Sequence, residues 1–239
     1  MAKNYNIPKS IFLDKRGHKI PVQVRHSKRA KRLFIRINLD TVELVMPNNN
    51  FSKAYNFLLS KEDWIRNKLK LYRKVIDTAG NIPILGRTYK VSHCQTSKEK
   101  VQLHDDGKLV VFCSQNNKIQ TLKKFLIDFL LLEIEPIINN LCNKMNLQAS
   151  RIKISDTKSS WGSCSSKKIL SFNWRLVFVP PKILFYVIVH EVCHLIEMNH
   201  SNRFWQLVSN LCPNYQQDKL WLKNNTLRLQ HYDLNLCFR

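Results

Sequence analysis

Short segments in which apolar and polar residues alternate dominate the beginning of the chain. Residues 19–24, 33–38 and 42–45 are rich in valine, isoleucine and leucine, and Pro47 closes the third segment. In the second segment isoleucines alternate with polar side chains. This period of two predicts strands of a sheet that has one face in contact with water.

Residues 52–76 follow a helical period instead, and Ser52 can cap the helix. Aromatic rings among basic residues can stack on nucleic-acid bases. Because Trp64 and Tyr72 fall near the apolar stripe, we expect them to pack in the core. The stripe consists of Tyr55, Leu58, Leu59, Trp64, Ile65, Leu69 and Tyr72, and the opposite face is basic.

Strands resume between residues 88 and 112. The expected segments are 88–93, 100–104 and 109–112, with Asp105-Asp106-Gly107 as a hairpin turn between the last two. The polar stretch 114–117 that follows is the clearest break in composition. We therefore expect a β-rich N-terminal domain with one helix at residues 1–115 and a second domain at residues 116–239.

The second domain combines helices with a sheet. A helical pattern runs from residue 118 to about 146, and we expect it to be bent or broken near Pro136. Strands are expected near residues 151–154 and 169–179. Three further helices follow, of which the first begins at Pro180-Pro181 and contains the apolar run 183–189; the others are 202–211 and 216–230. The fold class is α+β.

The apolar helix that begins at Pro180-Pro181 carries His190-Glu191-Val192-Cys193-His194, which has the form H-E-x-x-H. On a helix, residues four apart are roughly 6 Å apart on one face. His190 and His194 can therefore direct their imidazoles to one point, as zinc ligands do. Glu191 can reach a water bound to the metal and take its proton, so this pattern is typical of a metal hydrolase.

A catalytic zinc site takes three protein ligands, and we expect His200 to be the third. In a straight helix His200 would lie about 15 Å along the axis from His190, so the chain must turn back. We place the turn at Met198–Asn199, because Asn199 can adopt a left-handed conformation and Ser201 can cap the next helix. Glu197 is the minor alternative ligand, followed by Asp218 or His231.

An H-E-x-x-H pattern also arises by chance in helices. Here three of the chain's eight histidines fall within eleven residues of an apolar segment. Buried imidazoles and a buried carboxylate are costly without partners, and a metal ion provides one. The clustering therefore favours a metal site over a structural role.

The chain has 39 lysines and arginines against 17 acidic residues, a formal charge of +22. Residues 1–115 carry +14 and residues 116–239 carry +8. The stretch from Arg25 to Arg32 holds five basic side chains and no acid, and it can grip phosphates. Such a charge attracts nucleic acid, nucleotides or an anionic surface, although a solvated basic surface explains it equally well.

Seven cysteines are scattered singly, without C-x-x-C spacing, which suits a reducing compartment. The N-terminus lacks the apolar core of a signal peptide. Charged residues interrupt every stretch long enough to span a membrane. We therefore expect a cytoplasmic protein without a membrane span.

Several segments together resemble the YgjP-like metallopeptidase domain family, which is related to the SprT-like zinc proteases. They are 161–166, 172–176, 186–194 and 199–205, with 25–32 and 85–89. The resemblance implies a zincin-like domain in which His190, His194 and His200 hold Zn²⁺ and Glu191 is the general base. Such proteins often have a basic residue directly before the Trp-Gly-Ser-Cys stretch, whereas here Ser160 precedes it and Lys158 is the nearest cation.

The zincin resemblance also implies that a peptide substrate is added as a strand beside the metal helix. Residues 169–177 are the candidate edge strand, with Asn173 and Arg175 available to contact substrate. Arg175 can stabilise an oxyanion or hold a carboxylate. Trp161 and Ser163 can line the cleft, or shape a tight turn at Gly162. Structural hydrogen bonding explains Asn173 and Arg175 as well.

Three functions compete. A zinc peptidase acting on a peptide or protein is favoured. A metal-dependent hydrolase of nucleotides or other anionic small molecules would use the positive field to attract its substrate. A DNA-associated, protease-like protein would dock nucleic acid or nucleotide on its basic N-terminal half. Affinity for DNA that falls steeply with salt would support the last function.

Overall fold

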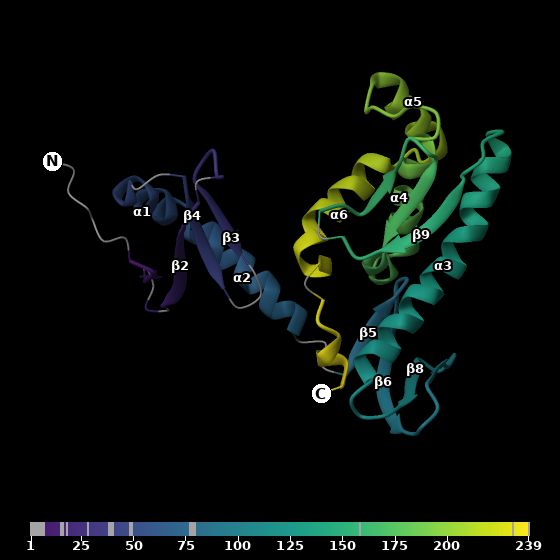
Figure 1. The fold of residues 1–239 in the computed structure, drawn as a ribbon, viewed down its shortest axis with the longest axis horizontal. Coiled ribbons are helices and arrows are strands. Elements are labelled where there is room, and N and C mark those ends of the chain that lie inside the picture. The colour runs from purple at the N-terminus through teal and green to yellow at the C-terminus, as the bar shows by residue number, and fades with distance from the viewer. Residues whose placement is uncertain are drawn as a thin grey trace. The chain divides into compact units, whose positions relative to one another are not determined.

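The computed structural model describes residues 8–238 except 15–16, 18, 28, 38–40, 48–49, 77–79, 158 and 231. It divides into two compact units, residues 1–77 and residues 78–239 (Figure 1). Each unit has its own sheets and its own helices. Within the part of the chain that the structure describes, no helix is long and apolar enough to cross a membrane.

The N-terminal unit contains a four-stranded sheet of order β1-β2-β4-β3. Its strands are β1 Ser10–Leu13, β2 Ile20–His26, β3 Phe34–Ile37 and β4 Val42–Met46. β2 and β4 run parallel, and the other two pairs are antiparallel. The central strand β4 buries Val42, Leu44, Val45 and Met46. The expected alternation of buried and exposed residues is clearest in β1 and β2.

Two helices follow the sheet, where the sequence predicted one. α1 spans Phe51–Ser60, and α2 spans Glu62–Ile76. The cap is Asn50, whose side chain accepts from the Lys53 amide, and not Ser52. Lys61 separates the helices, and its backbone N–H bonds back to carbonyls of α1. The spacing of apolar residues predicts that a segment is helical, but it does not show that the helix is interrupted at a single residue.

The C-terminal unit begins with a second four-stranded sheet of order β5-β6-β8-β7. Its strands are β5 Asn81–Ile84, β6 Arg87–Gln95, β7 Lys100–Leu103 and β8 Lys108–Cys113. β7 and β8 form the expected hairpin, in which Gly107 has a φ of 83°. That conformation is strained for a residue with a Cβ, so glycine is required at this position of the turn.

Helix α3, Lys118–Lys144, runs alongside both sheets of this unit (Figure 1). The expected break near Pro136 is absent, and the helix continues through the proline. Leu122 and Leu126 share one buried core with Leu109 and Val111 of β8. The division therefore lies near residue 77 rather than between 115 and 116, because the second sheet packs on α3 and belongs to the same core.

The third sheet has the order β10-β11-β9. β9 is Arg151–Ser155, β10 Gly162–Cys164 and β11 Ile169–Asn173. The chain continues through η1 Trp174–Phe178, α4 Pro181–Cys193, α5 Asn202–Leu211, α6 Tyr215–Gln230 and η2 Leu234–Phe238. The expected strand 169–179 is thus a shorter strand followed by a 3₁₀ helix. Mixed sheets and helices confirm the α+β class.

Candidate metal centre

Helix α4 places the H-E-x-x-H residues in the interior of the C-terminal unit. Pro181 occupies its first turn, where a missing N–H costs nothing. Nearly all its side chains between Ile183 and Cys193 are buried. Because the apolar positions surround the helix, its polar side chains are carried into the core with it. His190 and Glu191 therefore lie away from bulk water.

Three histidines converge at the end of α4. One ring nitrogen from each of His190, His194 and His200 lies within 4.8 Å of the other two. The Nε2 atoms of His190 and His200 are 3.0 Å apart. Two nitrogens that bind one zinc ion in tetrahedral geometry are about 3.3 Å apart. The structure thus brings together the three residues that the sequence singled out as ligands.

The turn that brings His200 back lies earlier than expected. α4 ends at Cys193, and Leu195 and Ile196 donate backbone bonds to residues three positions before them. Asn199 is not among the described residues with a positive φ; its Oδ1 accepts from the Ser201 amide at 3.0 Å. Besides this earlier turn, residues 198–199 form a bend at the predicted place, but Asn199 does not adopt the predicted left-handed conformation. Ser201 caps α5 as expected, accepting from the Phe204 amide.

A backbone carbonyl fixes the orientation of His194. Its Nδ1 donates to the Glu197 oxygen at 2.9 Å, which leaves Nε2 directed at the other histidines. Glu197 contributes this carbonyl and is not part of the convergent group. Asp218 is buried elsewhere and accepts from the Cys212 thiol at 3.7 Å. His231 lies outside the described residues.

Aromatic rings of α5 surround the histidines. Phe204, which is fully buried, stacks on His194 with ring centroids 4.4 Å apart. Trp205 stacks on His200 at 5.6 Å. This part of α5 packs against the metal helix α4. Phe204 covers one face of the buried His194 ring, whereas His200 remains exposed despite its contact with Trp205.

The protonation of the histidines suits a cation. Burial, followed by repulsion from the neighbouring His194 and His200, lowers the pKa of His190 to about 3. Burial also lowers the pKa of His200. Nδ1 of His190 is buried without a partner among the described residues. Neutral imidazoles offer lone pairs, so the three converging rings fit a metal ion.

Glu191 directly follows His190 on α4 and is not part of the convergent group. Only 5% of the residue is exposed. Burial raises the pKa of its carboxyl to about 8. A Cβ added to Gly162 would lie 2.5 Å from Glu191 Oε1. Gly162 therefore allows strand β10 to lie directly against the carboxylate, and it occupies this strand rather than the tight turn that the sequence suggested.

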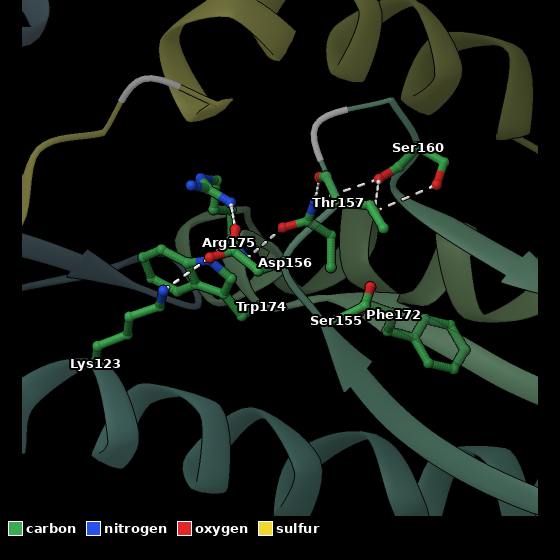
Figure 2. Close-up of polar contacts among 9 residues, drawn as sticks. Lys123, Ser155, Asp156, Thr157, Ser160, Phe172, Trp174 and Arg175 are labelled. Carbon is green, nitrogen blue, oxygen red and sulfur yellow. Dashed lines mark hydrogen bonds and ion pairs between the residues drawn. The ribbon is translucent and has the colours of Figure 1, made fainter. Parts of the chain in front are cut away.

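Asn173 and Arg175, the two expected substrate contacts, both take part in hydrogen bonds within the fold. Figure 2 shows the contacts of Arg175 with Asp156. Asn173 is 1% exposed, caps η1 through the Arg175 amide and donates to the carbonyls of Thr157 and Ser160. The guanidinium of Arg175 donates to Asp156 at 2.5 Å and lies over the Trp174 ring. Both side chains are thereby held within the fold, so the structure does not place them as free groups for substrate.

Asp156 is the centre of that network. Burial alone would raise its pKa, but hydrogen bonds from Lys123, Arg175 and Trp174 outweigh burial and hold the pKa far below its usual range. Lys123 comes from α3, and the other two come from η1. The carboxylate thus ties α3 to the segment after β11, and Asn173 ties that segment to the loop before Trp161.

The remaining expected contacts lie on or beside β10. Trp161 is partly buried and donates from Nε1 to Thr226 at 3.3 Å, so it contacts α6. Ser163 is exposed on β10. β11, the expected edge strand, is central in its sheet, between β10 and β9. The edge strand next to Glu191 is therefore β10. Lys158 lies outside the described residues.

No pattern in the sequence indicated Lys219, which the fold brings to the site. Its ammonium lies 4.1 Å from the centroid of the Trp205 ring, the ring that stacks on His200. Burial is the largest cause of the lowered pKa values of His190 and His200, and repulsion from neighbouring histidines comes next. The positive charge of Lys219 makes a smaller contribution in the same direction. Within the described part of the chain Lys219 makes no ion pair. Only the packing of α6 beside α4 reveals it.

Comparison with known proteins points to a metallopeptidase family. The family model described as "YgjP-like, metallopeptidase domain" matches residues 31–225, most of the chain. Among curated proteins, none matches the chain in sequence. The crystal structure of the metallopeptidase zymogen abylysin from Pyrococcus abyssi is 18% identical, with 38% of this chain and 93% of that chain covered. Its TM-score of 0.35 is too low to carry a conclusion.

Proposed function

The chain belongs to the YgjP-like metallopeptidase domain family, and on that premise we propose that it is a zinc-dependent peptidase of the zincin type. His190, His194 and His200 would hold the ion. The observation that carries the proposal is the convergence of three imidazole nitrogens within 4.8 Å. The buried residue Glu191 directly follows the first of these histidines on the same helix. Three protein ligands rather than four leave a position for water or substrate.

A zinc ion held there supplies Lewis-acid chemistry, because it lowers the pKa of water and polarises a carbonyl oxygen. The imidazoles must be neutral to bind it, and the low pKa of His190 keeps this ring neutral at physiological pH. The Glu197 carbonyl oxygen accepts a hydrogen bond from Nδ1–H of His194. The lone pair of this ring is therefore on Nε2, where it is available to the ion.

Glu191 would act as the general base. Its Oε1 would accept a proton from the attacking water and then give it to the leaving amine. A buried carboxyl with a raised pKa holds a proton well enough to return it. Gly162 lets β10 approach this carboxylate, so a substrate on that strand would lie within reach of it.

Strand addition at β10 would hold the substrate. β10 pairs with β11 on one side only, so the other edge of this strand has no partner strand in its sheet. A peptide in extended conformation would pair there through its main chain. Exposed Ser163 lies on this strand, whereas β11 cannot take a further neighbour.

Lys219 would bind a negatively charged oxygen of the substrate, the role that the sequence had suggested for Arg175. Its ammonium lies next to the rings of the cluster, and no described acidic residue neutralises it. A cation at this place stabilises the charge that develops on the carbonyl oxygen, or holds a carboxylate of the substrate.

Purified zinc-loaded protein tested against an unstructured protein and against nucleoside triphosphates separates peptidase from nucleotide hydrolase. We expect cleavage of the protein substrate that is lost in both His194→Ala and Glu191→Gln. Nucleotide turnover that disappears with His194→Ala, without any cleavage of protein, would contradict the proposal.

A further inference from the structure

The N-terminal unit contains a cavity of about 500 Å³ that the metal site does not use. It lies between strand β3 with its preceding loop and the junction of α1 and α2. Phe34, Phe57 and Trp64 provide aromatic walls, and Arg32 and Lys61 provide positive charge. Its volume is in the range of cavities that hold small ligands.

Trp64 is the main aromatic surface of the cavity. It was expected to pack in the core, but it is 45% exposed. Its neighbour Ile65 takes the core position at 0% exposure, and Trp64, about 100° away around α2, lines the cavity. A half-exposed indole beside a cavity offers a flat face for stacking.

The two cations of the cavity have no acidic partner among the residues that the structure describes. Arg25 and Arg36 contact Glu43, and Arg66 contacts Glu62. Arg32 and Lys61 form no ion pair with any residue that the structure describes. The sequence of residues 1–77 contains 18 basic and 6 acidic residues, so the surroundings are positive as well. Unpaired cations in such a field favour an anionic ligand.

We propose that this cavity binds single-stranded nucleic acid, with an unpaired base stacked on Trp64 and the neighbouring phosphates on Arg32 and Lys61. The combination of an aromatic face with a positive rim is the usual means of binding single strands. An acidic peptide would use the same cations but carries no flat base for the indole. A duplex keeps its bases stacked inside and leaves the cavity unfilled.

This inference does not depend on the peptidase proposal. All five residues that carry it lie in residues 1–77, and none of the histidines contributes. His194→Ala should therefore leave nucleic-acid binding unchanged while it removes the metal. The two proposals can fail separately.

Fluorescence anisotropy of the full chain with labelled oligothymidylate of about 15 nucleotides tests the stacking contact. We expect Trp64→Ala to weaken binding about 5- to 150-fold, because one base–aromatic stack contributes roughly 1–3 kcal/mol. Trp64→Phe should retain most of the affinity. Phe12→Ala is the matched control, because Phe12 is a large exposed aromatic of the same unit outside the cavity. Circular dichroism confirms that each variant is folded.

The salt dependence of the same measurement tests the cations. Replacing Arg32 and Lys61 together by glutamine should reduce the slope of log K against log salt by about 1.4, since each phosphate contact on a single strand contributes about 0.7. Lys53→Gln, on α1 and outside the cavity, should leave the slope unchanged. Equal affinity of Trp64→Ala and wild type would overturn the proposal. So would equal competition by duplex DNA, equal competition by polyglutamate, or no binding at low salt.

Discussion

At Gly162 the absence of a side chain leaves room for the carboxylate of Glu191. A Cβ there would meet three atoms of the glutamate, at 2.5, 2.6 and 2.7 Å. Such distances are far shorter than any relaxed contact between carbon or oxygen atoms. Any other residue at position 162 must displace either strand β10 or the proposed base. The fold thus couples the substrate strand to Glu191 through one residue.

Gly162→Ala should therefore damage both stability and activity. We expect a loss of about 1–3 kcal/mol in the free energy of unfolding, as for overpacked cores, and a large fall in kcat. Thermal unfolding and peptide hydrolysis measure the two effects. Ser163→Ala, on the exposed face of the same strand, is the control. An alanine variant with wild-type stability and turnover would show that the contact does not constrain Glu191.

Lys219→Met should lower kcat/KM about 10- to 100-fold, because it removes a cation proposed to bind a substrate oxygen. Zinc content should be unchanged, since Lys219 is not a ligand. The same substitution at Lys223, one turn further along α6 and exposed, should have little effect. Identical kinetics for both variants would remove Lys219 from the site.

In the metal-free protein, the buried carboxyl of Glu191 should make stability depend on pH. Its pKa in the folded protein is about 8, above the ordinary value of 4.5. The contribution of the protonated carboxyl to stability is therefore complete below pH 4.5 and is lost as the pH rises through about 8. Melting temperatures of wild type and Glu191→Gln should therefore diverge as pH rises, with the glutamine variant more stable at about pH 9. A difference that does not vary with pH would contradict the raised pKa.

At the scale of single residues, the sequence predicted the convergent group well. H-E-x-x-H spacing on an apolar helix fixes His190, Glu191 and His194 by local geometry alone, and the excess of histidines pointed to His200. Asn173 and Arg175 were harder to interpret, because the sequence does not show whether a polar side chain is exposed or hydrogen-bonded within the fold. Their partners Thr157, Ser160 and Asp156 come from loops that only the folded chain brings near.

At the scale of elements, the network around Asp156 joins α3 to the segment after β11. The folded pKa of Asp156 is depressed, so its contribution to stability is present above the ordinary pKa of aspartate and disappears as pH falls through the folded value. The side chain is 46% exposed, which limits the energy of each ion pair. The side chain of Arg175 is only 12% exposed. Because water solvates its charge less well, Arg175 needs the Asp156 carboxylate more than Asp156 needs Arg175.

Asp156→Asn should destabilise the protein near neutral pH by about 1–3 kcal/mol, because it leaves the Arg175 charge partly buried without a carboxylate. The difference from wild type should begin to shrink as the pH falls below about 4, the ordinary pKa of aspartate, and should go on shrinking as the pH falls further toward the folded value. Melting temperatures across this range provide the test. Asp128→Asn, an exposed acid on α3, is the control. A pH-independent difference would mean that charge at Asp156 is not what stabilises the network.

Element boundaries could be predicted only where local chemistry determines them. Pro180-Pro181 and Ser201 mark two helix starts correctly. The end of α4 at Cys193, the position of β11 in the middle of its sheet and the interruption at Lys61 depend on what packs against each segment. Strand order in particular is set by the parallel pairing of β9 with β11, which no local pattern records.

At the scale of the whole molecule, the chain consists of two units with separate tasks in this account. The composition break at residues 114–117 is a loop that leads into α3 and not a boundary, because Leu109 and Leu122 on either side of it are buried in one core. The sequence indicated the charge of the N-terminal part but not the cavity that concentrates it. A cavity depends on how helices and strands pack against each other, and periodic patterns in the sequence do not predict that packing.

The metal content of two variants tests the central claim most directly. His200→Ala removes the proposed third ligand, and Glu197→Ala removes the nearest alternative carboxylate while the carbonyl that orients His194 remains. Elemental analysis of purified protein should show about one zinc per chain in wild type and in Glu197→Ala, and strongly reduced zinc in His200→Ala. Full zinc in His200→Ala, or loss of zinc in Glu197→Ala alone, would contradict the three-histidine site.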